Sequence, residues 1–140
     1  MKQEFIPYEQ ALALKELGFD EGCLGYHNID PYLPKPTFNL VKPFDHEWCL
    51  PAPLYQQAFR FFREKYNISY SIDWMSRSLE FYNGYYVHFR GINGNKINQE
   101  NFIVLNDELP PKGYGVYKTY EEAELACLIK LIEIVKNKII

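Results

Sequence analysis

Apolar residues recur at spacings of three and four in three stretches of the chain, and each stretch predicts an amphipathic helix. The first helix is expected from about Tyr8 to Leu17. Gly18 follows it, and a glycine at this point is typical of a left-handed C-terminal cap. Phe19 should then fold back onto the last helical turn.

The second helix is expected to begin after Pro51-Ala52-Pro53, because proline is tolerated where the first-turn amides have no helical partners. Its pattern places Arg60, Arg63 and Glu64 on the outward side. We expect the opposite side to be a buried stripe, made of Tyr55, Ala58, Phe59, Phe62 and Tyr66.

The third helix has the clearest signals at its ends. Thr119 is suited to cap the first-turn amides, and Glu122, three residues later, completes a capping-box pattern. Lys136 and Lys138 lie near the negative end of the helix dipole, where cations are favourable. The apolar set is wider than one stripe, so this helix should lie across a sheet: Ala123, Ala126, Cys127, Leu128, Leu131, Ile132, Ile134 and Val135.

Between the second and third helices the apolar period changes to two, which predicts strands. Residues 68–74 form one candidate strand. Residues 79–82 and 85–90 form two more, joined by Asn83-Gly84, a dipeptide that strongly favours a type I′ hairpin turn. The expected register places Phe81 opposite Tyr86.

This hairpin would sort its side chains onto two faces. Tyr86, His88 and Arg90 would share one face, and the more apolar Val87 and Phe89 would lie on the other and meet the helices. Because tyrosine and arginine are enriched at binding hot spots, the first face is a candidate binding surface. A solvated face whose tyrosines only cover the edge of the core is the alternative interpretation.

Residues 28–53 hold six prolines and are expected to wrap over the surface, because proline cannot join the interior of a sheet. The strands expected near this segment are limited to Cys23–Tyr26 and Phe38–Val41. Phe102–Leu105 is a further short candidate strand within the loop-rich residues 91–118.

Together these elements predict a single α+β domain over residues 1–140, with three main helices packed on one face of a small antiparallel sheet. Residues 1–52 would supply an N-terminal helix and a Pro-rich wrap. Residues 53–140 would form the core, with the order α-β-β-β-α at 53–136.

Composition adds an aromatic excess and an acidic balance to this picture. Aromatic residues make up 17% of the chain, which favours either a ring-packed sheet or an aromatic surface that faces a ligand. The formal net charge of −3 argues against a general binder of nucleic acid or anionic membranes.

The cysteines and the N-terminus bear on the compartment. The 3 cysteines form no CxxC pair, so reduced thiols are expected rather than a secreted disulfide framework. The sequence has neither an apolar leader segment nor an 18-residue apolar run. We expect a cytoplasmic protein.

No constellation in the sequence has recognisable catalytic chemistry. Asp45, His46 and Cys49 are residue types that bind zinc, but their spacing matches no established cluster, and a surface turn is the simpler interpretation. Cys127 falls on the apolar helical face and is expected to fill the core. We expect no catalytic residues, no metal site and no cofactor.

The order helix, three strands, helix at 53–136 resembles the double-stranded-RNA-binding domain family, and Lys118-Thr119-Tyr120-Glu121-Glu122-Ala123-Glu124 resembles the start of that family's last helix. The resemblance implies the topology. In the family, lysines at this helix start grip phosphates of the duplex. Here Glu121, Glu122 and Glu124 stand in that place and would repel them, so nucleic acid is not an expected partner.

The chain also resembles small uncharacterised proteins of phages and prophages of gut Bacteroidetes. Three segments carry this resemblance, at residues 8–21, 51–60 and 120–127. It implies a phage or mobile-element accessory factor in a bacterial host cell and brings no known activity.

The leading hypothesis is a non-enzymatic interaction protein that binds a protein partner or itself through the aromatic sheet face or residues 28–53. The candidate binding residues are Arg60, Arg63, Tyr86, His88 and Arg90. One alternative is a protein that binds or sequesters a nucleotide, with tyrosine stacking on the base and an arginine on the phosphate. A degenerate double-stranded-RNA-binding module is another.

Overall fold

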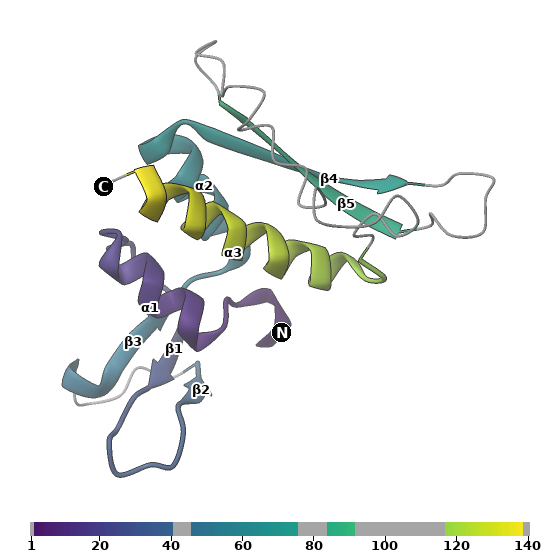
Figure 1. The fold of residues 1–140 in the computed structure, drawn as a ribbon. Helices are drawn as coiled ribbons and strands as arrows, with labels where there is room; N and C mark the ends of the chain where they lie inside the picture. The colour runs from purple at the N-terminus through teal and green to yellow at the C-terminus, as the bar shows by residue number, and fades with distance from the viewer. Residues whose placement is uncertain (1, 41–45, 76–83, 92–116, 139–140) are drawn as a thin grey trace. The chain divides into compact units, whose positions relative to one another are not determined.

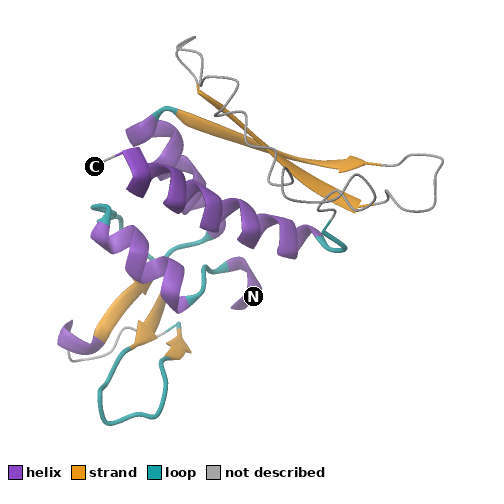
Figure 2. Ribbon diagram, viewed as in Figure 1, coloured by secondary structure: helices purple, strands orange, loops and turns teal. Residues whose placement is uncertain are grey.

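The computed structural model describes residues 2–40, 46–75, 84–91 and 117–138. They belong to two compact units, Met1–Ala58 and Phe59–Ile140, each of which is described by itself. The division falls inside helix α2 (Tyr55–Tyr66) rather than before it. Both units combine helix with antiparallel strands, so the predicted α+β class is confirmed (Figures 1 and 2).

The first unit is a small antiparallel sheet with a helix beside it. The strand order is β2 (Thr37–Asn39), β1 (Gly25–Asn28), β3 (Cys49–Ala52), and α1 (Tyr8–Glu16) contacts β3. Two short 3-10 turns complete the described elements, η1 (Lys2–Glu4) and η2 (His46–Trp48).

Strand β3 corrects the expectation that the proline-rich residues 28–53 only wrap over the surface. Pro51 pairs with Tyr26 of the central strand β1. The pairing is possible because β3 is an edge strand among the described strands, and a proline without an N–H is tolerated at an edge. The two predicted strands in this region are present, but each is shifted by a short distance along the chain.

The end of α1 is the predicted glycine cap. Gly18 has φ 96°, in the left-handed region, and its N–H donates to the Lys15 carbonyl at 3.0 Å. The N–H of Phe19 donates to the Leu14 carbonyl at 2.9 Å, which completes a Schellman motif. The Phe19 side chain folds back and is buried, as predicted.

The core of the first unit closes over a glycine. The rings of Phe5 and Phe38 lie 4.9 Å apart, and a Cβ on Gly25 would approach them to 2.8 Å and 2.6 Å. Buried His27 lies beside them, with Nε2 3.0 Å from the Ile6 carbonyl oxygen. Since a carbonyl only accepts, Nε2 carries the proton of this hydrogen bond.

The second unit is a two-stranded antiparallel sheet covered by helices on one face. Strand β4 (Ile68–Met75) pairs with β5 (Gly84–Gly91), and α3 (Tyr120–Lys138) contacts both strands (Figure 1). Phe59 of α2 stacks on Tyr70 of β4 with ring centroids 4.0 Å apart. Its core consists of Phe59, Phe61, Phe62, Ile68, Val87, Ala123, Cys127, Leu128, Leu131, Ile132 and Val135.

The predicted pairing of residues 85–90 with 79–82 is wrong. Tyr86 lies opposite Asp73 of β4, and Gly84, which was expected in the turn, pairs with Met75. Strand β4 offers an 8-residue partner, so it forms a longer ladder than the four residues 79–82 could. Residues 79–82 and the candidate strand 102–105 lie outside the described residues.

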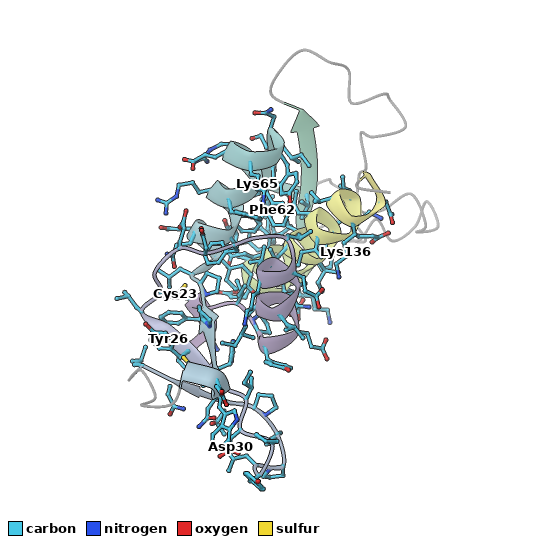
Figure 3. The ribbon with its side chains drawn as sticks, turned by 90° about the vertical axis from the view of Figure 1, so that its left-hand side faces the viewer. Cys23, Tyr26, Asp30, Phe62, Lys65 and Lys136 are labelled. Atoms are coloured by element: carbon cyan, nitrogen blue, oxygen red, sulfur yellow. The ribbon has the colours of Figure 1, made fainter. Side chains whose placement is uncertain are left out.

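Both helices of the second unit follow their predicted patterns. The N–H of Glu122 donates to Thr119 Oγ1 at 3.2 Å, which is the expected N-terminal cap of α3. On α2, Arg60, Arg63 and Glu64 are exposed, and the predicted stripe is buried except for half-buried Tyr66. Figure 3 labels Phe62 within this stripe and Lys65 on the exposed side.

Candidate functional site

The five predicted binding residues come from two elements, α2 and β5. Arg60 and Arg63 are exposed on α2. On β5, Val87 is fully buried and marks the face that meets the helices. Because strand positions alternate between faces, the other three predicted residues occupy positions on the opposite face: Tyr86, His88 and Arg90. Their side chains lie outside the described part of the structure.

Three polar residues of β4 share that outer face, and the sequence analysis did not predict them as site residues. Asp73, Ser71 and Ser69 are the register partners of positions 86, 88 and 90. The hydroxyl of Ser71 donates to Asp73 Oδ2 at 3.0 Å. The alternation of polar residues between Ile68 and Trp74 is the sequence signal that could have identified this row.

A second feature lies where β4, β5 and the start of α3 meet. The Trp74 and Tyr85 ring centroids are 4.9 Å apart with the planes at 76°, and Tyr120 lies 5.7 Å from Tyr85 at 88°. Trp74 remains 53% exposed and Tyr120 41% exposed. We call these three side chains the aromatic corner.

Backbone pairing fixes the positions of the three rings. Trp74 and Tyr85 are direct cross-strand partners. Tyr85 exchanges both of its backbone hydrogen bonds with Tyr117, each at 2.9 Å, so its pair with Trp74 is of the non-hydrogen-bonded kind, in which side chains lie closest. The same bridge brings the chain to β5 immediately before the Thr119 cap, which places Tyr120 against Tyr85.

Two carboxylates border the aromatic corner. Glu124 follows Tyr120 by four residues and therefore shares its face of α3, and both Glu124 and Glu121 raise the pKa of Tyr120 in addition to burial. Burial, reinforced by Glu121, raises the pKa of the Glu124 carboxyl. The corner thus combines aromatic rings with carboxyl groups.

The phenols behind the corner also hold their protons. Burial raises the pKa of Tyr70 to about 12, with Tyr120 adding to the shift and the Arg63 guanidinium opposing it. Burial likewise raises the pKa of Tyr117. Cys127 is fully buried, and burial together with Glu124 raises the pKa of its thiol well above the usual value, so this cysteine is an inert core residue.

The proline-rich segment of the first unit contains an ordered turn. Asn28 Oδ1 accepts from the Asp30 N–H at 3.0 Å, and Asp30 Oδ1 accepts from the Tyr32 N–H at 2.9 Å. The N–H of Leu33 donates to the Asp30 carbonyl at 3.0 Å, which closes a β-turn with Pro31 at its second position. This loop projects from the sheet, with Asp30 labelled on it in Figure 3, and leaves Tyr32 85% exposed.

Two classes of site are not found among the described residues. No three His, Cys, Asp or Glu side chains there gather in a way that could hold a metal ion. Cys49 is half-buried, while Asp45 lies outside the description. Within the same ranges, no helix has the length and apolar character needed to cross a membrane.

Comparison with known proteins supplies no further guide. No protein-family model, no curated protein and no solved structure matches the chain. Function therefore has to be argued from the geometry of the aromatic corner and the ordered turn.

Proposed function

We propose that this protein is a non-enzymatic binding protein that docks a protein partner at the aromatic corner. The observation that carries the proposal is the exposure of Trp74 and Tyr120 in a fixed arrangement. Aromatic residues of this kind dominate binding hot spots because they bury a large area on contact.

The way in which the rings of the corner are positioned supports the same conclusion. Two backbone pairings, the β4–β5 register and the Tyr85–Tyr117 bridge, position them together with the Thr119 side-chain cap on the Glu122 N–H. A partner would therefore spend little free energy on ordering these side chains, and more of the contact energy would appear as affinity.

The ordered turn at residues 30–33 offers a second contact surface. The Tyr32 N–H donates to Asp30 Oδ1, and the Tyr32 and Trp48 ring centroids lie 6.1 Å apart with their planes at 78°. Such a preordered, exposed tyrosine is suited to insertion into a partner's pocket.

The two alternatives receive less support. For a nucleotide, Arg63 and Tyr70 are close enough to interact, but one face of the Tyr70 ring is occupied by Phe59 at 4.0 Å. For duplex RNA, Glu121 and Glu122 are exposed at the start of α3, where they would repel phosphates.

The proposed biological setting is that of a phage or mobile-element accessory factor acting in the cytoplasm of a bacterial host. It rests on the sequence resemblance alone. The binding proposal does not depend on it, because the corner is defined by contacts within the second unit.

Site-specific photocrosslinking tests the proposal. A benzoylphenylalanine replaces Tyr120 or, as a matched control on the same helix, Ile129, which is 45% exposed against 41% for Tyr120. We expect a partner adduct, or a crosslinked dimer, at position 120 only, and its loss when Trp74→Ala is added. The same probe at Tyr32 tests the turn. Equal adducts at 120 and 129, or none at 120, would contradict docking at the corner.

A further inference from the structure

We infer that the aromatic corner recognises a cation, namely the side chain of a lysine or arginine in a basic segment of the partner. This inference rests on the proposed function and specifies its chemistry. It follows from three properties of the corner: the angles between its rings, the sign of the charge beside them, and the partial burial of the Glu124 carboxyl.

The ring geometry is suited to a cation. Tyr85 stands nearly perpendicular to both of its neighbours, at 76° to Trp74 and 88° to Tyr120. Aromatic faces carry partial negative charge and edges partial positive charge, and rings at right angles meet edge to face instead of stacking flat on one another. Trp74 and Tyr120 also keep 53% and 41% of their surface exposed, which is available to a ligand. Ammonium and guanidinium groups bind to aromatic faces, and tryptophan binds them most strongly.

The charge beside the rings has the complementary sign. Glu121 and Glu124 both act on the Tyr120 phenol. The N-terminal end of a helix ordinarily favours anions. Here that end carries the Thr119 cap on the Glu122 N–H and the carboxylates of the first turn, so an anionic ligand would meet repulsion. Lys118 is exposed two residues before Tyr120 and only partly offsets the two glutamates.

Among the described residues, no cation acts on Glu124, although its carboxyl is half-buried. The groups that interact with it electrostatically are the carboxyl of Glu121, the thiol of Cys127 and the phenols of Tyr70 and Tyr120. Burying a carboxylate without an opposite charge costs stability. A cation over the rings would supply the missing charge, and a residue that costs stability in this way is typical of a binding site.

The exposure of the corner favours a side chain over a free small cation. With Trp74 and Tyr120 about half in water, the corner is open, whereas small-molecule sites enclose most of their ligand. A lysine or arginine within a peptide gains additional contacts from its neighbouring residues. We therefore assign the cation to a peptide segment.

A titration of the full chain with defined probes tests the inference. The probes are a blocked peptide of alternating arginine and glycine, the same peptide with neutral citrulline in place of arginine, a glutamate–glycine peptide, and tetramethylammonium chloride. The variants are Trp74→Leu and Glu124→Gln, with Glu122→Gln as the matched control. Glu122 is exposed on the same turn of α3 but lies on a different face from Tyr120. Binding is followed by calorimetry, and thermal melts confirm that each variant folds.

We expect the arginine peptide to bind and the citrulline peptide to bind about fivefold more weakly, as the loss of a cation–π contact at a partly exposed site implies. Trp74→Leu and Glu124→Gln should each weaken the binding of the arginine peptide by about threefold to fivefold. Glu122→Gln should change its affinity less than about twofold. Added salt should weaken the binding, because part of the attraction is between exposed charges.

The outcomes separate this inference from the proposed function. If the arginine peptide fails to bind while the position-120 crosslink persists, recognition of a cation is wrong and docking at the corner stands. If the crosslink is also absent, both fail. Binding of tetramethylammonium without the peptide would overturn the assignment to a side chain, and binding of the glutamate peptide would overturn the sign of the charge.

Discussion

Two aromatic clusters of this protein, one in each unit, use their rings in opposite ways. In the first, Phe5 and Phe38 close over Gly25 so tightly that a single added carbon would meet both rings. In the second, Trp74 and Tyr120 touch Tyr85 and keep about half of their surface in water. An aromatic-rich composition therefore has two explanations in one chain. The first pair belongs to the core because it packs on a glycine backbone, and the second is a candidate site because its rings stay exposed.

The largest expected effect contrasts one ring from each unit. Phe5→Ala removes a buried ring and should destabilise the first unit by about 3–5 kcal/mol. Trp74→Ala removes a half-exposed ring and should cost no more than about 1 kcal/mol, in the range of surface substitutions. Chemical denaturation measures both free energies of unfolding.

Tryptophan fluorescence can report on each unit separately, since Trp48 lies in the first and Trp74 in the second. Unfolding of Phe5→Ala is followed at Trp48 in a Trp74→Phe background. Trp74→Ala itself is followed by circular dichroism. A Trp74→Ala cost as large as that of Phe5→Ala would show that the corner is core rather than surface.

A smaller effect is expected from a pair of glycines in the first unit. Gly25→Ala places a Cβ within 2.6 Å of the Phe38 ring and 2.8 Å of the Phe5 ring. Overpacking of this kind costs about 1–3 kcal/mol. Gly22→Ala meets no atom within 4 Å and is the matched control, with an expected change below about 0.5 kcal/mol. Similar Trp48 melting curves for the two variants would contradict the close packing of the Phe5 and Phe38 rings on Gly25.

The sequence specified the local features of both units and not their long-range pairing. The helices were predictable because apolar spacing, the Gly18 cap and the Thr119 cap all act within a few residues. The partner of β5 was not, since residues 79–82 and 68–75 both alternate and an Asn-Gly pair favours the nearer one. Pro51 concealed β3, because only the three-dimensional structure shows that this strand lies at an edge.

The aromatic corner was hidden for the same reason. Trp74, Tyr85 and Tyr120 come from three elements, and the β4–β5 register together with the Tyr85–Tyr117 bridge brings them together. The sequence did indicate that the aromatic excess could form a ligand-facing surface and that the glutamates at the start of α3 oppose phosphate. Neither of these two features of the sequence predicted which aromatic rings would lie beside which carboxylates.

The smallest expected effect on stability is also the most specific to the second unit. Burial and Glu121 raise the pKa of Glu124 from its usual 4.5. A carboxyl whose pKa is higher in the folded state stabilises the fold fully below its unfolded pKa, and this contribution is lost as the pH rises through the folded pKa. The contribution of Glu124 to the free energy of unfolding should therefore fall as the pH rises above 4.5.

Glu124→Gln carries no charge at any pH, so it should be more stable than the wild type at pH 7 and lose this advantage as the pH falls below the Glu124 pKa. Exposed Glu122→Gln is the control and should lack this pH-dependent gain. Urea titrations at a series of pH values, read at Trp74 in a Trp48→Phe background, measure the differences. If Glu124→Gln gains stability at neutral pH and loses the arginine peptide, the carboxylate weakens the fold while serving the ligand, as a stability–function trade-off requires. If Glu124→Gln gains stability and still binds the arginine peptide as the wild type does, the Glu124 carboxylate does not contribute to binding of the cation.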